Sequence, residues 1–391
     1  MNSPIKPIER IEKLTGKEFF RPQGKDLLAQ IFYDFRNWAK NKKVIIVGGT
    51  NGKGEVCYYL EKILIDNGKS TALFTSPHLH KINERFRFNS ELLPSEKIQQ
   101  NLDSFEKKYP GNHIQLSFFE LIFWIFLNQA KFLNSEYLIL EVGLGGRLDV
   151  TNMIDPDISI ITNISRDHTE ILGNRYDQIL KEKLGITRSK VPLICGVELN
   201  YLKNKVKIDS RKRNFDVTFV NKAKNFHLKN ISTARTAIDK LNEYYSTCLE
   251  ITKNFNEPAK IDPRRLTIKK ENACVDFLGS HNLDGHRAVL KSDLEIKDKY
   301  DLIIMNFSNR PENEISNILS LYINNGYDFV INGRKFFKSC PLEKLEGIIT
   351  RKKHKDIKIL KDTTDFLSTF NKNYNVLWIG SYYSHDCLNE L

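Results

Sequence analysis

The sequence predicts an α/β protein of two domains, each built on a mostly parallel sheet. Short, nearly continuous apolar runs alternate with longer helical patterns through the first part of the chain, which is typical of parallel strands covered by helices on both faces. A polar, proline-containing stretch without periodicity follows at 252–263, as expected for a linker. The alternation then resumes, and 391 residues are too many for one ordinary core.

In the first domain, we expect strands where β-branched and other apolar residues form short runs. In chain order these runs are KVIIVG (43–48), STALFT (70–75), YLILEVG (137–143), ISIITNI (158–164) and VPLICG (191–196). Helices are expected from about Lys53, through SFFELIFWIFLNQAKFL (117–133) and through STARTAIDKLNEYY (232–245). This order predicts a parallel sheet with helices on both faces.

The second domain is expected to repeat the pattern on a smaller scale. Its strand-like runs are ACVDFLG (273–279), YDLIIMNF (300–307), YDFVING (327–333), DIKIL (356–360) and NVLWIGS (375–381). No G-x-G-x-x-G motif follows any of them, so the sequence does not support a dinucleotide site there. We place the domains at 1–257 and 258–391.

Composition predicts a cytoplasmic protein with small acidic ligands. The longest apolar stretch, FFELIFWIFL, is about ten residues long and contains a glutamate, so we expect neither secretion nor a membrane span. Six cysteines without a C-x-x-C pair fit reduced thiols. The net charge of +12 favours acidic partners. Basic and acidic residues alternate, however, and no basic motif interleaved with aromatics is present, so small polyanions explain the charge without nucleic acid.

The motif GGTNGKG (48–54) lies between the first strand and the first long helix. Glycines let backbone N–H groups approach phosphate oxygens, the helix N-terminus favours anions, and Lys53 can neutralise phosphate charge. A generic glycine-rich turn is the alternative interpretation. Glu55 stands where such loops usually offer a hydroxyl. Its carboxylate is expected either to bind Mg²⁺ or to turn away at the helix N-terminus, where an anion is stabilised.

Four further motifs bring polar residues to predicted strand ends or to a helix. They are FTSPHLHKINERFRFN (74–89) with Ser76, ILEVGLGGRLDVTN (139–152) with Glu141, ITNISRDHTEILG (161–173) with Asp167 and His168, and LKEKLGI (180–186) with Lys183. Local evidence alone favours a proline turn before a charged loop for the first motif and an ordinary exposed helix position for Lys183. Glu141 is the hard oxygen ligand that Mg²⁺ prefers. Because ligands of parallel sheets bind beyond the carboxyl ends of strands, we expect these groups to converge.

Taken together and in this order, GTNGKG, FTSPHL, NERFRFN, SFFEL, LEVGLGGRLDVTN, DHTEILG and EKLGI resemble the folylpolyglutamate synthase and dihydrofolate synthase family of the Mur-ligase type. The match covers most of the first 200 residues. It is weaker beyond, in PRRL (263–266), LGSHN (278–282) and IGSYY (379–383). The resemblance implies a P-loop Mur-ligase-type central domain, a smaller Rossmann-like C-terminal domain and an active site between them.

The resemblance also implies a role for individual residues. ATP is expected at Gly49, Thr50, Asn51, Gly52, Lys53, Gly54 and Arg265, and Mg²⁺ at Ser76, Glu141, His168 and, if it is carbamylated, Lys183. The folate is expected at Pro77, His78 and Arg85, and L-glutamate at His281 and Ser381. The catalytic residues would be Lys53, His168, Lys183, Arg265 and His281. Carbamylation of Lys183 has chemical sense, because an ammonium repels a cation whereas the carbamate attracts one.

The implied reaction joins L-glutamate to dihydropteroate, a reduced folate or both, through an acyl phosphate formed with ATP. The expected protein is a cytoplasmic monomer whose partners are these small molecules. The chain departs from the family motifs at Glu55, Thr233, Arg264 and Leu278. Two alternatives therefore stay open: a relative that binds nucleotide or folate without ligation, and a Mur-type amide ligase that acts on another acid.

Overall fold

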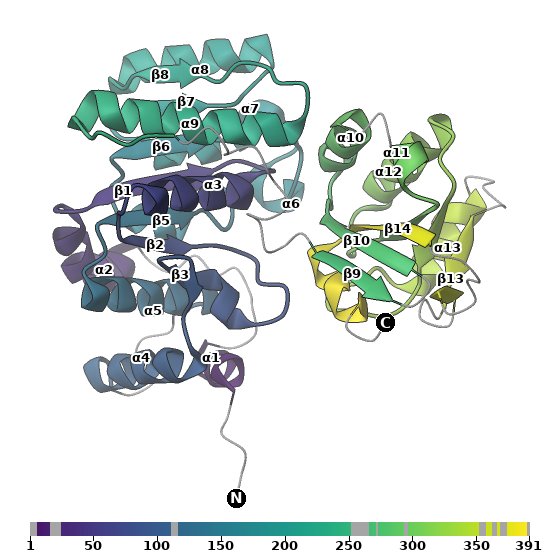
Figure 1. Ribbon diagram of the computed structural model, residues 1–391, viewed down its shortest axis with the longest axis horizontal. Coiled ribbons are helices and arrows are strands. Elements are labelled where there is room, and N and C mark those ends of the chain that lie inside the picture. The colour runs from purple at the N-terminus through teal and green to yellow at the C-terminus, as the bar shows by residue number, and fades with distance from the viewer. Residues whose placement is uncertain are drawn as a thin grey trace, which may run out of the picture. The chain divides into compact units, whose positions relative to one another are not determined.

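Figure 1 shows the chain as a computed structural model, which describes residues 6–15, 25–110, 116–251, 266–270, 273–292, 296–351, 357–361, 366–367 and 374–388. The chain divides into two compact units. Unit 1 comprises Met1–Ala223 and His227–Ile261, and unit 2 comprises Lys224–Phe226 and Asp262–Leu391. The domain boundary expected from the sequence, between 257 and 258, lies outside the described residues.

The sheet of unit 1 has the strand order β4-β3-β2-β5-β1-β6-β7-β8. Its strands are β1 (Lys43–Gly48), β2 (Thr71–Phe74), β3 (Phe86–Phe88), β4 (Glu91–Leu92), β5 (Tyr137–Glu141), β6 (Ile158–Ile161), β7 (Leu193–Cys195) and β8 (Val217–Phe219). From β2 to β8 all neighbours pair in parallel, while β3 and β4 add an antiparallel edge. The mostly parallel α/β sheet predicted from the sequence is thus confirmed.

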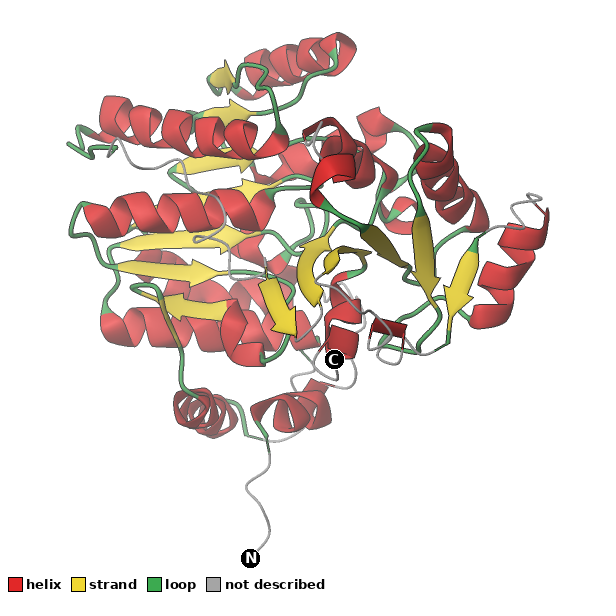
Figure 2. Ribbon diagram, turned by 45° about the vertical axis from the view of Figure 1, so that its right-hand side comes forward, coloured by secondary structure: helices red, strands yellow, loops and turns green. Residues whose placement is uncertain are grey.

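Successive residues of each strand point to opposite faces, and each face has its own apolar core. On one face, Ile45 and Val47 of β1 pack with helices α3 (Lys53–Asp66) and α9 (Phe226–Tyr245). On the other, Val44 and Ile46 pack in a cluster with α2 (Lys25–Ala39) and α5 (Phe118–Leu133). Figure 2 shows these strands between the helical layers.

The remaining helices of unit 1 also bury apolar residues. They are α1 (Pro7–Thr15), α4 (Ser95–Lys108), α6 (Thr169–Leu172), α7 (Tyr176–Lys183) and α8 (Asn200–Arg213), with short 3₁₀ turns η1 (Ile82–Arg85), η2 (Val150–Met153) and η3 (Leu184–Ile186). α5 begins with a capping box, in which Ser117 and Glu120 each bond the other's backbone N–H, at 3.3 and 2.7 Å. Within the described residues, no helix is both long and apolar enough to cross a membrane.

Unit 2 contains a smaller sheet in the order β13-β12-β11-β14-β10-β9. Its elements are β9 (Leu266–Lys270), β10 (Ala273–Gly279), α10 (Leu283–Ser292), α11 (Ile296–Lys299), β11 (Leu302–Asn306), α12 (Glu312–Asn324), β12 (Phe329–Asn332), α13 (Leu342–Arg351), β13 (Lys358–Leu360), β14 (Tyr374–Gly380) and η5 (Tyr382–Leu388). β9 is antiparallel to β10, and the other described pairs are parallel. Residues of α10, α12 and α13 form one apolar cluster with residues of β11, β12 and β14.

Candidate active site

The candidate site of unit 1 lies along the carboxyl edge of the neighbouring strands β2, β5, β1 and β6. The register pairs Phe74 with Leu140, Val47 with Glu141 and Gly48 with Ile161, so these strands end at similar heights. The segments that follow them carry the glycine-rich loop and the groups expected to surround it. The convergence inferred from sequence spacing therefore has a direct basis in the strand order.

The loop between β1 and α3 takes a backbone path that depends on glycine. Gly49 has φ +135°, and Gly52 has φ +82°, where other residues are strained. A β-carbon on Gly49 would also lie 1.9 Å from Thr162 Oγ1. Asn163 Oδ1 accepts the N–H groups of Thr50 and Asn51 at 3.2 and 2.9 Å. The segment after β6 thus fixes the conformation of the loop.

Lys53 begins α3 and lies half-buried beside the loop. Its Nζ donates to the carbonyl oxygen of Thr50 at 3.2 Å. Thr50 is held in turn by Ser165, whose N–H donates to Thr50 Oγ1 at 3.0 Å. The ammonium group and the N-terminus of α3, which starts with Lys53 and Gly54, are therefore brought together. Both features favour a bound anion such as phosphate.

The carboxylate of Glu55 turns toward α9. It is buried, with 5% of the residue exposed. His227 Nδ1 lies 2.6 Å from Oε1, Asn230 Nδ2 donates to Oε2 at 2.9 Å, and Tyr59 Oη donates to Oε1 at 3.3 Å. Of the two conformations expected from the sequence, the structure has the one in which Glu55 turns away. Its position in the first turn of α3 suits an anion as well.

Glu141 ends β5 as a carboxylate that is only 2% exposed. Its Oε2 accepts the hydroxyl of Thr75 and, at 2.9 Å, the N–H of Ser76. The buried charge is thus hydrogen-bonded, as a carboxylate in this environment requires. Ser76 and Glu141, expected to share a metal, are neighbours with hard oxygen donors that suit Mg²⁺.

Lys183, at the end of α7, is buried against the loop rather than exposed on a helix face. Its Nζ donates to the carbonyl oxygen of Gly49 at 2.8 Å. Burial and the Lys53 ammonium lower the pKa of Lys183 to about 7, although Asp167 and Asp149 act in the opposite direction. A lysine with this pKa is partly neutral at neutral pH, which is the form that reacts with CO₂.

His168 is more open to solvent than its predicted partners, with 47% of the side chain exposed. It is the N-cap of α6 with φ +48°, and its Nδ1 lies 3.8 Å from Glu170 Oε1. The backbone N–H of His168 donates to Asp167 Oδ1 at 3.1 Å. Within the described part of the chain, no three side chains of His, Cys, Asp or Glu form a metal-binding group. A metal ion at this site would therefore also need Ser76 and Lys183 as ligands.

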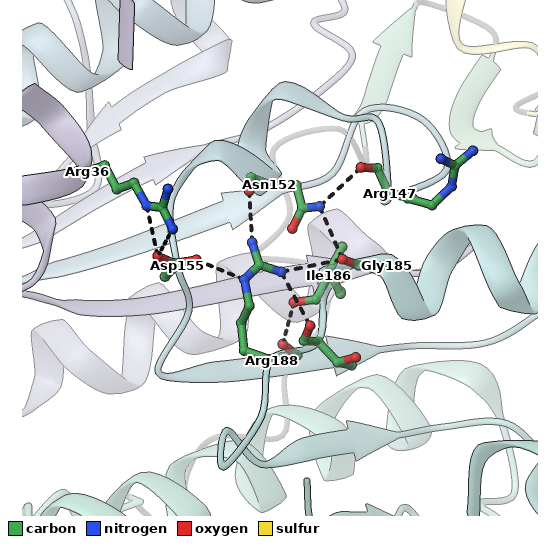
Figure 3. A network of polar contacts seen from close by, with 9 residues as sticks. Arg36, Arg147, Asn152, Asp155, Gly185, Ile186 and Arg188 are labelled. Atoms are coloured by element: carbon green, nitrogen blue, oxygen red, sulfur yellow. Dashed lines mark hydrogen bonds and ion pairs between the residues drawn. The ribbon is translucent and has the colours of Figure 1, made fainter. Parts of the chain in front are cut away.

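The turn that follows α7 is anchored by Arg188, as Figure 3 shows. The Arg188 guanidinium donates to Asn152 O at 2.9 Å, to Gly185 O at 3.4 Å and to Asp155 Oδ1 at 2.8 Å. Asn152 Nδ2 donates to Arg147 O and Gly185 O at 3.2 and 3.1 Å. These bonds join the turn after α7 to the segment that follows Glu141.

The segment expected to bind the folate has a buried arginine at its centre. Arg85 is 2% exposed, lies over the ring of Phe118 and donates through Nε to His78 Nδ1 at 2.8 Å. Burial and the positive charge of Arg85 lower the pKa of His78 to about 3, so this histidine is neutral at neutral pH. Pro77 follows Ser76 through a cis peptide bond. Arg85 therefore holds this segment together through its contacts with His78 and Phe118.

In unit 2, His281 and Ser381 follow the carboxyl ends of the neighbouring parallel strands β10 and β14, whose last residues pair. Ser381 is buried, and its Oγ accepts a hydrogen bond from the hydroxyl of Ser308 at 2.8 Å. The ring of His281 lies 5.6 Å from that of Tyr382. Arg264 and Arg265 lie outside the described residues.

Leu278, one of the departures from the family motifs, packs against the apolar cluster of unit 2. Asp276, two residues earlier, accepts hydrogen bonds from Thr267 and Tyr300 at 2.6 and 2.7 Å. Burial raises the pKa of Asp276, but these bonds and Lys299 more than offset it, and the pKa is lowered. The Asp276 carboxylate is thus engaged by hydrogen bonds within unit 2.

Thr233 is fully buried, and its hydroxyl donates to Lys229 O of its own helix at 2.8 Å. The α9 residues that bond Glu55, in the first turn of α3, lie one or two turns earlier. They are His227 and Asn230, which motif reasoning did not single out. Thr162 and Asn163 were also missed as loop supports, although they stand within a predicted strand-end motif. Their position directly after a buried strand was the feature of the sequence that could have identified them as loop contacts.

Residues 120–261 match the family model described as the Mur ligase middle domain. The dihydrofolate synthase/folylpolyglutamate synthase of Buchnera aphidicola subsp. Acyrthosiphon pisum is 40% identical over 223 residues, which cover 52% of this chain. The chain spans about half the length of that relative, 53%. The resemblance inferred from the sequence motifs is confirmed.

Solved structures resemble the chain over nearly its whole length. The Escherichia coli protein FolC in complex with ADP has a TM-score of 0.79 and 23% identity, covering 98% of this chain and 97% of its own. A bifunctional folylpolyglutamate synthase/dihydrofolate synthase with Mn, AMPPNP and L-glutamate bound has a TM-score of 0.80 and 20% identity, covering 99% and 98%. The chain therefore has the two-domain Mur-ligase fold of these proteins.

Proposed function

We propose that the protein is an ATP-dependent ligase that joins L-glutamate to dihydropteroate, a reduced folate or both. The observation that carries this proposal is the convergence of the loop, Lys53, Ser76, Glu141 and Lys183 at the carboxyl edge of one sheet. Relatives of this chain are named dihydrofolate synthase/folylpolyglutamate synthase. A solved structure with the same fold holds Mn, AMPPNP and L-glutamate together.

The chemistry explains why such an enzyme needs a phosphate loop. A carboxylate is a poor electrophile, because it is negative and resonance-stabilised. Transfer of the γ-phosphoryl group of ATP to this carboxylate gives an acyl phosphate and ADP, and the amine of glutamate then attacks the acyl carbon, forms the amide and displaces phosphate. In this proposal the Lys53 ammonium and the N-terminus of α3 offset the charge on the phosphates during both steps. The acyl phosphate must be kept from water meanwhile.

Ser76, Glu141 and His168 would hold Mg²⁺, which would supply positive charge beside the transferred phosphoryl group. Lys183, already bonded to the loop at Gly49, would add a ligand once carbamylated. As an ammonium it would repel the ion, so the modification is part of the proposal. The hydrogen bonds from Thr75 and Ser76 hold the Glu141 carboxylate in one orientation.

In unit 2, His281 and Ser381 would bind the incoming glutamate, and Arg265 would contact the phosphates. In unit 1, Pro77, His78 and Arg85 would shape the folate site. We further propose that the protein acts in the cytoplasm, as a monomer, on small molecules. A basic protein attracts such anionic substrates.

A phosphate-release assay tests the function. The protein is given ATP, Mg²⁺, L-glutamate and either dihydropteroate or a reduced folate. Release that requires both glutamate and one of the pterins supports the ligase, and the preferred pterin identifies the substrate. Nucleotide binding without release supports a non-ligating relative, which the departure from the family motif at Leu278 in unit 2 favours. Release with neither pterin but with another acid supports a different amide ligase.

A further inference from the structure

The Glu55 carboxylate stands beside the phosphate loop, two residues after Lys53, and its hydrogen bonds are made with α9 and α3. Both oxygens of Glu55 are engaged: Oε1 by His227 at 2.6 Å and by Tyr59 at 3.3 Å, and Oε2 by Asn230 at 2.9 Å. An ionised carboxylate only accepts hydrogen bonds, so each of these groups must act as a donor. The shortest of the three bonds is that from His227.

The donors come from one surface of α9 and from α3 itself. His227 and Asn230 are three residues apart and lie on the same face of the helix, while Tyr59 lies one turn after Glu55. Asn230 also lies against the loop, because a β-carbon on Gly52 would be 2.6 Å from Asn230 Oδ1. The first turns of α9 therefore contact both the loop and the carboxylate next to it.

We propose that His227 is a positioning residue that holds the Glu55 carboxylate against α9, away from the phosphates of the nucleotide. The proposal rests on nucleotide binding at this loop, as argued above. A buried carboxylate that loses its donor must pair with a cation or remain buried at a cost in free energy. Lys53, two residues away, is such a cation, and a Lys53–Glu55 pair would remove the charge that the phosphates need. The carboxylate itself would repel the phosphates.

The test is a set of binding measurements with Mg²⁺ and the ATP analogue AMPPNP, by isothermal titration calorimetry. We expect His227→Ala to weaken binding at least ten-fold. Glu55→Ser should bind within three-fold of the original protein, since it has no carboxylate to hold. The double variant His227→Ala/Glu55→Ser should also bind within three-fold. Loss of a merely structural contact by His227 would leave the double variant as weak as the single one.

Two further variants keep the test decisive. His227→Asn retains an N–H donor near the position of Nδ1 and should bind within three-fold, even if His227→Ala fails to fold by circular dichroism. Lys62→Ala, on the exposed face of α3, is the matched control and should bind like the original protein. A ten-fold loss in Glu55→Ser alone would overturn the proposal, because the carboxylate would then be a working ligand.

The outcomes also separate this proposal from the proposed function. If the original protein binds AMPPNP but releases no phosphate with any acid, ligation fails and the role of His227 is still decided by the double variant. If the double variant stays as weak as His227→Ala while ligation is observed, the role of His227 fails alone. If the original protein does not bind AMPPNP, both proposals are wrong.

Discussion

His286 is a buried histidine in unit 2 that is neutral in the native protein at neutral pH. It is 1% exposed, and its Nδ1 lies 2.9 Å from the hydroxyl of Tyr322. Burial lowers the pKa of His286 to about 3, with smaller contributions from the positive charge of His281 and Arg310. Between pH 6.5 and 3 the unfolded chain therefore binds a proton that the native protein does not bind, so stability falls as pH falls through this window.

We expect His286→Gln to remove this acid sensitivity. The original protein should lose stability on the order of 1 kcal/mol per pH unit below about 6.5 from this group, and the variant should lose less. Urea unfolding at about pH 7.5 and about pH 4.5, on either side of the ordinary histidine pKa, measures both. His80→Gln, at an exposed histidine, is the control and should follow the original protein. Equal losses in the original protein and in His286→Gln would contradict the prediction.

Single residues differed in how far the sequence could place them. Glu141 was predictable, because a glutamate that ends a buried strand needs polar partners, and Thr75 and Ser76 supply them. The conformation of Glu55 was not, because its partners on α9 lie 172 and 175 positions away. No local pattern reports a contact between side chains so far apart. Lys183 was read as exposed on local evidence for the same reason.

Arg188 holds together elements that surround the site. Its guanidinium bonds the turn after α7 to the segment after Glu141 (Figure 3). We expect Arg188→Ala to lower the free energy of unfolding by about 1–3 kcal/mol, because half-buried carbonyl groups lose a charged donor. Hydrogen exchange in residues 183–187 should rise with it. Chemical denaturation and exchange mass spectrometry measure the two effects.

Arg36→Ala provides the matched control for Arg188→Ala. Arg36 also pairs with Asp155, at 2.8 Å, but its side chain is 55% exposed, and exposed ion pairs contribute roughly 0–1 kcal/mol. Its removal should change stability little and leave exchange at 183–187 unaltered. The same effect from both substitutions would mean that the charge of Asp155, rather than the carbonyl bonds, matters.

Among the elements, the buried parallel strands were predictable and several edge elements were not. The continuous apolar runs of β1, β5 and β14 identify central strands directly. β8 has only partly buried residues, and β4 is two residues long, so neither has a pattern of its own. β3 and β9 are antiparallel additions at sheet edges. The partner strand determines such short segments more than their own composition does.

The whole molecule is expected to unfold in two steps, because each unit has its own apolar core. Differential scanning calorimetry should resolve two transitions. AMPPNP and Mg²⁺ at about one hundred times the dissociation constant should stabilise unit 1 by about 2.7 kcal/mol, which raises its midpoint by roughly 5 °C or more. The transition of unit 2 should move less. One transition that shifts as a whole would show that the units unfold together.

For the whole molecule, the sequence was informative because the polar stretch at 252–263 interrupts a regular alternation of strand-like and helical segments. This interruption predicted two α/β units, the second smaller than the first. The strand order could not, since crossovers place β1 between β5 and β6. Periodicity identifies a strand but not its neighbours, which depend on how the helices pack.

That strand order has a consequence for the newly made chain. β1 is synthesised early, yet its neighbours are β5 and β6, and the donors to Glu55 stand on α9, near residue 230. When β1 has left the ribosome but β5, β6 and α9 have not, the glycine-rich segment is exposed without the elements that fix its conformation. We therefore expect nascent chains to acquire nucleotide affinity late, only after α9 has left the exit tunnel, and to present their unpaired central strand to chaperones until β5 and β6 have emerged.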